Sequence, residues 1–152
     1  MDIGGDEVMF LHSEKAKELI GKQPPMDKTV VRRVKEALLR KGVVLDQSDE
    51  IDRYLIEYGF EAVTYSEGTI IMHTDVSASG FYEELIHLGQ IKSGKTIQEN
   101  KENNLLMEIE AQERLIKHQK AYGITDFEIE VLKNNCDMYR NELIKLRGGE
   151  YV

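Results

Sequence analysis

Three side chains near the middle of the chain, Glu83, Glu84 and His87, have types and spacing suited to a metal site. Glu83 and His87 are four residues apart, so on a helix they project from the same face one turn apart. Two side chains at that spacing can hold one metal ion. Glu84 would lie beside them, where its carboxylate can polarise a water molecule next to the metal.

The segment Glu-Glu-Leu-Ile-His at 83–87 differs by one residue from the zinc motif His-Glu-x-x-His. Glu83 stands at the position of the first histidine. A carboxylate can coordinate zinc, although a site with one imidazole and two carboxylates is less common and weaker for zinc. The sequence therefore predicts a metal site in which Glu83 and His87 are two of the ligands.

A third ligand is expected from the helical segment 105–121, whose apolar residues define a buried side. Glu108 falls among those apolar residues, whereas Glu110 points away from them. A buried carboxylate without a partner costs several kcal/mol or shifts its pKa. A divalent metal is one compensating partner and a buried hydrogen bond is another. We therefore predict Glu108 as the third ligand, with Glu110 as the second choice.

These candidate ligands lie in a pattern of helices around one hairpin. The spacing of apolar residues and the capping residues predict helices over 13–21, 27–42, 48–58, 105–121 and 125–146. Residues 60–65 and 69–73 are rich in β-branched and aromatic side chains and predict a hairpin. The polar connector 74–79 then leads into the helix that carries Glu83 and His87, and a loop over 93–104 follows that helix.

The expected architecture is a mostly helical α+β fold with a short β-hairpin before the helix that carries the candidate ligands. We divide the chain into an N-terminal segment with a short helix (1–26), a single domain (27–147) and a tail (148–152). A chain of 152 residues can build one domain with a core of its own.

Composition excludes several classes of function. The formal net charge of −8 argues against a nucleic-acid surface that spans the whole domain. The basic run over 28–41 is expected to be a solvated helix face, and contact with a phosphate backbone or an acidic partner is the alternative. The single cysteine, Cys136, is expected to be buried and rules out an internal disulfide and a multi-cysteine zinc site. The sequence contains neither a transmembrane run nor a signal peptide. The chain is expected to be cytoplasmic where it is made, and export without a cleaved signal peptide stays open.

The predicted order of elements is a hairpin, a short cap, a helix with x-E-x-x-H, a loop and a helix reading E-x-E-A. Together these elements resemble the zincin metallopeptidases. The resemblance is greatest to the small zincins of phage-encoded regulators and bacterial polymorphic toxins. It covers about residues 60–122 and rests on 68–73, 81–90 and 108–112. It implies a zincin-like fold, a zinc cofactor, a protein or peptide substrate or partner, and for a toxin a cognate inhibitor protein. No nucleic acid or membrane partner is expected.

Residue by residue, the resemblance implies that His87 is a zinc ligand, that Glu84 is the general base, and that Glu108 or Glu110 is the ligand from the second helix. The first histidine of the family is Glu83 here. The added negative charge makes the ion a poorer Lewis acid. Two functions therefore stay open, a metal-dependent hydrolase and an inactive zincin-like domain that acts as a protein-binding regulator or toxin module.

Overall fold

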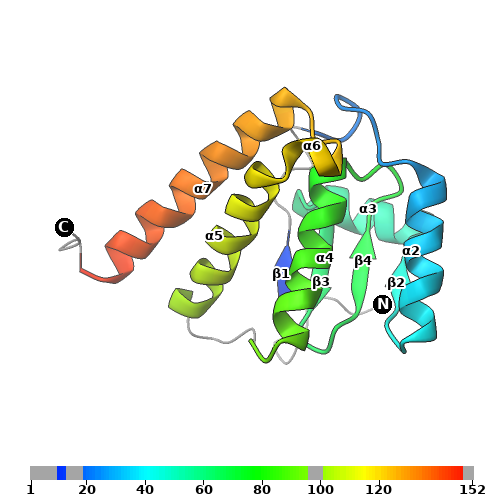
Figure 1. Cartoon of the computed structure of the whole chain (residues 1–152), viewed down its shortest axis with the longest axis horizontal. Helices are drawn as coiled ribbons and strands as arrows, with labels where there is room; N and C mark the ends of the chain where they lie inside the picture. Colours follow the sequence, from blue (N-terminus) through cyan, green and yellow to red (C-terminus); the bar gives the residue numbers. More distant parts are fainter. Residues whose placement is uncertain (1–9, 13–18, 96–100, 149–152) are drawn as a thin grey trace.

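The computed structural model describes residues 10–12, 19–95 and 101–148, and these form a mostly helical α+β fold, as predicted (Figure 1). The helices are α2 (Lys28–Arg40), α3 (Asp49–Tyr58), α4 (Ala78–Lys92), α5 (Lys101–Lys117), α6 (Gln119–Tyr122) and α7 (Asp126–Leu146). The strands are β1 (Phe10–His12), β2 (Leu45–Asp46), β3 (Ala62–Tyr65) and β4 (Ile70–Met72).

The four strands form one sheet in the order β1-β3-β4-β2. β3 and β4 are the predicted hairpin, and they pair antiparallel with Val63 opposite Ile71. β1 adds antiparallel to β3, and β2 adds parallel to β4. The sequence did not predict these two edge strands, because segments of three and two residues are too short to show an alternating pattern.

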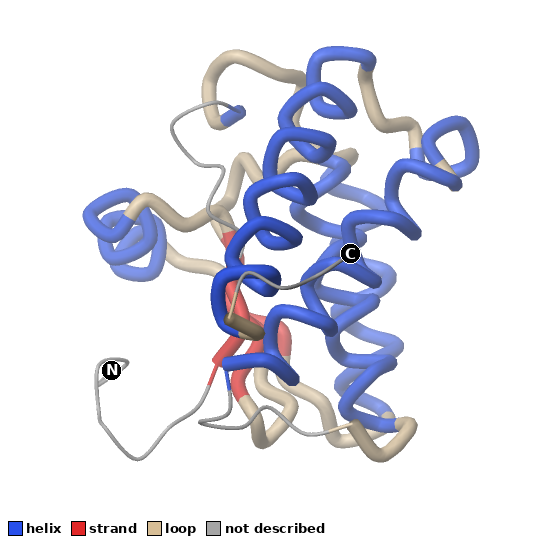
Figure 2. Tube along the Cα trace, turned by 90° about the vertical axis from the view of Figure 1, so that its left-hand side faces the viewer, coloured by secondary structure: helices blue, strands red, loops and turns tan. Residues whose placement is uncertain are grey.

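Side chains of the hairpin alternate between the two faces of the sheet, as the period of a strand requires. Ala62, Ile70 and Met72 face the main core under α2 and α4. Val63 and Ile71 face a second core under α3. Figure 2 shows the strands between helices on their two sides. Thr64 lies on the same face as Ala62, and this directs its hydroxyl toward α4.

Three helices pack together beside the sheet. α5 runs antiparallel to α4 and to α7, and the seam between α5 and α7 is extensive (Figure 1). α7 begins with a capping box, in which Thr125 and Glu128 are bonded to each other's backbone N–H groups. Glu128 also accepts hydrogen bonds from the backbone N–H and the hydroxyl of Ser79. One buried carboxylate therefore joins the first turn of α7 to the first turn of α4.

Several predicted boundaries differ from the structure. α5 begins at Lys101, four residues before the expected start, because its polar first turn carries no apolar pattern. The helix expected to continue to residue 121 is interrupted at His118, where α6 begins. The predicted helix over 13–21 falls largely outside the described residues, as do parts of the predicted loop (96–100) and tail (149–152).

The start of α4 is held by a second buried carboxylate, that of Glu61. Its Oε1 accepts a hydrogen bond of 2.9 Å from the backbone N–H of Ser77, the N-cap of α4. Carboxylates are favourable at this end of a helix because the backbone N–H groups there carry partial positive charge. A Cβ atom at Gly80 would lie 2.7 Å from Oε2 of Glu61, so any larger residue here would require the Glu61 carboxylate to move.

Replacing Gly80 with alanine should lower the free energy of unfolding by about 1–3 kcal/mol, because the buried Glu61 carboxylate would have to move. Gly89 in the same helix is the matched control, since a Cβ there would meet nothing within 4 Å. Gly89→Ala should raise stability by up to about 1 kcal/mol through helix propensity. Urea unfolding of both variants measures the difference, and equal effects would contradict the steric argument.

Candidate metal centre

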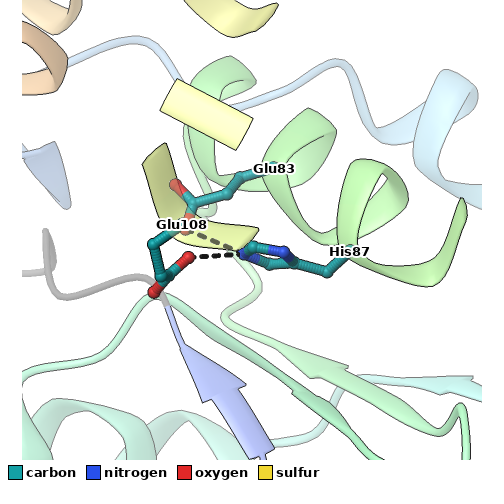
Figure 3. A group of neighbouring side chains, drawn as sticks. All are labelled: Glu83, His87 and Glu108. Atoms are coloured by element: carbon teal, nitrogen blue, oxygen red, sulfur yellow. Dashed lines mark ion pairs between the residues drawn. The ribbon is translucent and has the colours of Figure 1, made fainter. Parts of the chain in front are cut away.

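Glu83 and His87 of α4 and Glu108 of α5 converge on one point (Figure 3). One oxygen of each carboxylate and one nitrogen of the imidazole all lie within 4.8 Å of one another. Nε2 of His87 is 2.8 Å from Oε1 of Glu108 and 3.6 Å from Oε2 of Glu83. The structure thus brings together the three residues predicted as ligands, and this group could hold a metal ion.

The convergence follows from the local structure. Glu83 and His87 are one turn apart on α4, so their side chains share a face. The antiparallel course of α5 places Glu108 opposite His87 (Figures 1 and 3). All three residues are buried, with Glu83 and His87 at 0% and Glu108 at 5% exposure. As the sequence predicted, Glu108 lies on the buried side of its helix.

Gln90 fixes the orientation of the imidazole. Its amide nitrogen donates to the backbone oxygen of Met107 at 3.0 Å and to Oε1 of Glu110 at 2.8 Å. Its amide oxygen lies 2.8 Å from Nδ1 of His87. Because the amide nitrogen is already committed, the oxygen accepts and Nδ1 carries the proton. Nε2, the nitrogen that faces the two carboxylates, is then the one able to coordinate a metal.

Glu110, the second choice for a ligand, lies outside this group of three. Its two oxygens accept hydrogen bonds from Lys95 at 2.8 Å and from Gln90 at 2.8 Å. These bonds, that from Lys95 first, hold the pKa of Glu110 below its ordinary value. Glu110 therefore remains an anion that accepts a hydrogen bond from Gln90. By holding Gln90 in place, it helps to fix the orientation of the His87 imidazole.

The electrostatics of the group favour a positive charge at Nε2 of His87. Burial is the largest influence and by itself lowers the pKa of His87, but the carboxylates of Glu108, Glu83 and Glu84 outweigh it and raise that pKa well above 6.5. Either a proton or a divalent metal ion can supply the positive charge, and both act at the same nitrogen.

Glu84 lies beside the group but is not one of the three. It is fully buried, and its Oε1 accepts a hydrogen bond of 2.9 Å from the hydroxyl of Thr64 on β3. The sequence could not predict this bond, because Thr64 reaches α4 only once the sheet is formed. The hydroxyl of Tyr139, on α7, donates a hydrogen bond of 3.4 Å to Oε2 of Glu108.

Gln112, one turn after Glu108 on α5, adds a further polar group on this side of the helix. It is buried, with 1% exposure. Neither amide atom forms a hydrogen bond to the described residues. A buried amide without partners costs about 1–3 kcal/mol.

Comparison of the chain with protein-family models, with curated proteins and with solved structures gave no match. None of the described helices is long and apolar enough to cross a membrane. Conclusions about function therefore depend on the chemistry of the Glu83, His87 and Glu108 group and of the residues around it.

Proposed function

We propose that this chain is a zincin-like domain that binds zinc through Glu83, His87 and Glu108 and acts as a metal-dependent hydrolase on a protein or peptide. The single observation that carries the proposal is the convergence of the three ligand atoms within 4.8 Å. It is supported by Gln90, which leaves Nε2 of His87 facing the two carboxylates.

The donor set fits zinc. Ligands at ~2.0–2.1 Å in a tetrahedral arrangement lie ~3.3 Å apart. The contacts from His87 to Glu108 and Glu83 are 2.8 and 3.6 Å, and all three ligand atoms lie within 4.8 Å of one another. Two carboxylates would balance the charge of a divalent ion and leave the imidazole neutral. A hydrogen-bonded partner on the far nitrogen of a ligating histidine, here Gln90, is typical of metal sites.

In this proposal zinc would supply Lewis acidity toward a carbonyl and toward water. Glu84 would accept the proton of the attacking water and then deliver it to the leaving amine. Thr64 would hold the carboxylate of Glu84 in position through its 2.9 Å hydrogen bond. Glu83 would differ from the histidine of the family by adding negative charge at the metal.

Burial favours a second candidate, an inactive zincin-like domain that acts by binding a protein, as a regulator or toxin module. A catalytic zinc needs an open position for water or substrate, whereas a structural one is closed. Among the three described ligands the side chains of His87 and Glu83 are 0% and 1% exposed, and that of Glu108, at 7%, is the most accessible to solvent. Hydrolysis therefore requires this side of the site to open.

One experiment separates the two candidates. The protein is loaded with one equivalent of zinc and incubated with a proteome-derived peptide library, and new peptide termini are identified by mass spectrometry. Cleavage at a consistent set of bonds, absent from metal-free protein, supports the hydrolase. Stoichiometric zinc without any cleavage supports the binding module instead.

Replacing Gln90 with methionine should weaken zinc binding by about 10- to 100-fold, because His87 would lose the partner that fixes its tautomer and orientation. Lys95→Met is the control, since it removes only the exposed outer ion pair with Glu110 and should change zinc affinity less than about threefold. Competition against a zinc-binding dye measures both affinities. Equal affinities for wild type and Gln90→Met would show that Gln90 has no such role.

A further inference from the structure

A second candidate site lies away from Glu83, His87 and Glu108. It lies between α2 and the connector that precedes α4. A cavity of about 210 Å³ is lined there by Lys28, Val31, Arg32, Lys35, Gln47 and Thr74. Three of these side chains are cationic and none is a carboxylate. This lining is unusual in a chain whose formal net charge is −8.

The cations of this cavity are largely uncompensated. Within the part of the chain that the structure describes, Arg32 and Lys35 form no ion pair. Lys28 approaches Asp75 at 3.6 Å, but both side chains are more than half exposed, so the pair is weak. The cavity therefore concentrates positive potential on an acidic protein.

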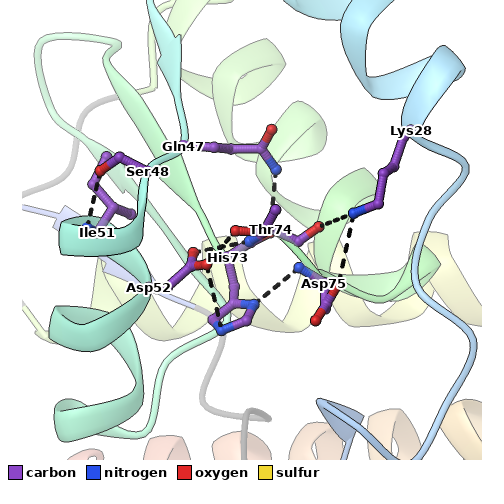
Figure 4. Close-up of polar contacts among 8 residues, drawn as sticks. All are labelled: Lys28, Gln47, Ser48, Ile51, Asp52, His73, Thr74 and Asp75. Carbon is purple, nitrogen blue, oxygen red and sulfur yellow. Dashed lines mark hydrogen bonds and ion pairs between the residues drawn. The ribbon is translucent and has the colours of Figure 1, made fainter.

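Figure 4 shows how the connector side of the cavity is held in place. Gln47 donates to the backbone oxygen of His73, and one further N–H of the same amide remains available. Asp52 accepts hydrogen bonds from the backbone N–H and the hydroxyl of Thr74. Lys28 donates to the backbone oxygen of Thr74 at 3.3 Å. These bonds hold Lys28, Gln47 and Thr74 of the cavity lining against the connector.

Size and charge together define the ligand. Cavities for drug-sized molecules measure about 300–1,000 Å³, and this one is smaller. Among its lining residues one side chain, that of Val31, is wholly apolar, and the others carry cationic or hydrogen-bonding groups. A guanidinium fork with two ammonium groups matches the tetrahedral oxygens of a phosphate group. We propose that this cavity is a binding site for a single phosphate group, borne by a small molecule or by a lipid headgroup.

The proposal is tested by titrating metal-free protein with inorganic phosphate in a calorimeter at physiological ionic strength. Metal-free protein is used so that coordination to a metal cannot contribute. Wild type should bind one phosphate per chain, and Arg32→Gln should weaken that binding about tenfold or more. Arg33→Gln is the matched control, because the neighbouring arginine on the same helix does not line the cavity. It should weaken binding less than about twofold.

A second arm uses phosphatidylcholine vesicles with and without phosphatidic acid. Binding that requires phosphatidic acid and is lost in Arg32→Gln alone assigns the phosphate to a lipid headgroup, whereas binding of free phosphate alone assigns it to a small molecule. The proposal is overturned if neither probe binds saturably. It is also overturned if Arg32→Gln and Arg33→Gln weaken binding equally. That result would mean that the overall positive charge of α2 attracts phosphate without a defined binding site.

Discussion

Replacing Glu84 with glutamine should lower metal-dependent hydrolysis by about 10²- to 10⁴-fold while bound zinc stays stoichiometric. Glutamine keeps the shape of the side chain, and its amide oxygen can still accept the hydrogen bond from Thr64. It cannot accept a proton from water. Peptide cleavage and metal content are measured on the same preparation, so a lost base is distinguished from a lost metal.

The control for this variant is Glu67→Gln, which removes one exposed carboxylate in the turn between β3 and β4. It changes the net charge by the same amount and should leave hydrolysis within about twofold of wild type, because exposed charges have weak effects at a distance. Full activity in Glu84→Gln would remove Glu84 from the mechanism. Loss of zinc in that variant would instead assign Glu84 to the support of the site.

Zinc should raise the thermal midpoint of the wild-type protein by about 5–10 °C at a free concentration 100 times the dissociation constant. Binding to the folded state alone contributes about 2.7 kcal/mol under that condition. For a chain of this size each kcal/mol corresponds to about 2–4 °C. The metal would also replace the proton on the buried imidazole of His87 as the partner of Glu83 and Glu108.

His87→Ala should abolish this shift, because it removes the only nitrogen among the three ligands. His118→Ala is the matched control, since His118 is exposed at the end of α5 and faces Tyr122. It should keep the whole shift. Glu108→Gln serves as a second variant with nearly unchanged volume, in case His87→Ala fails to fold. A shift that persists in both His87→Ala and Glu108→Gln would place the zinc elsewhere.

Much of the fold could be predicted from the sequence because its signals are local. The β-branched run at 69–73 and the capping box at Thr125 depend only on neighbouring residues, and the structure confirms the strand and the helix that they predict. β1 and β2 could not be predicted in this way. They exist only as edges added to the hairpin, and their pairing partners are distant in the sequence.

In the candidate site, too, the features set by local spacing could be predicted and those set by tertiary packing could not. The four-residue spacing placed Glu83 and His87 together, and the apolar neighbours of Glu108 placed it inward. The role of Gln90 depends on the backbone of Met107 across the α4–α5 pair, which no pattern in α4 reveals. The second buried carboxylate under α4, that of Glu61, likewise required the tertiary structure. Spacing thus predicted the three ligands, and packing determined the groups that orient them.

The most direct test of the metal site is the zinc content of protein purified without chelator, determined by elemental mass spectrometry for wild type, His87→Ala and His118→Ala. Coordination by Glu83, His87 and Glu108 predicts about one zinc per chain in wild type and in His118→Ala, and none in His87→Ala. The contradicting result is wild-type protein that carries no zinc as purified and none after refolding with excess zinc and desalting. In that case the buried group is an ion pair around a protonated imidazole, and the proposed hydrolase is wrong.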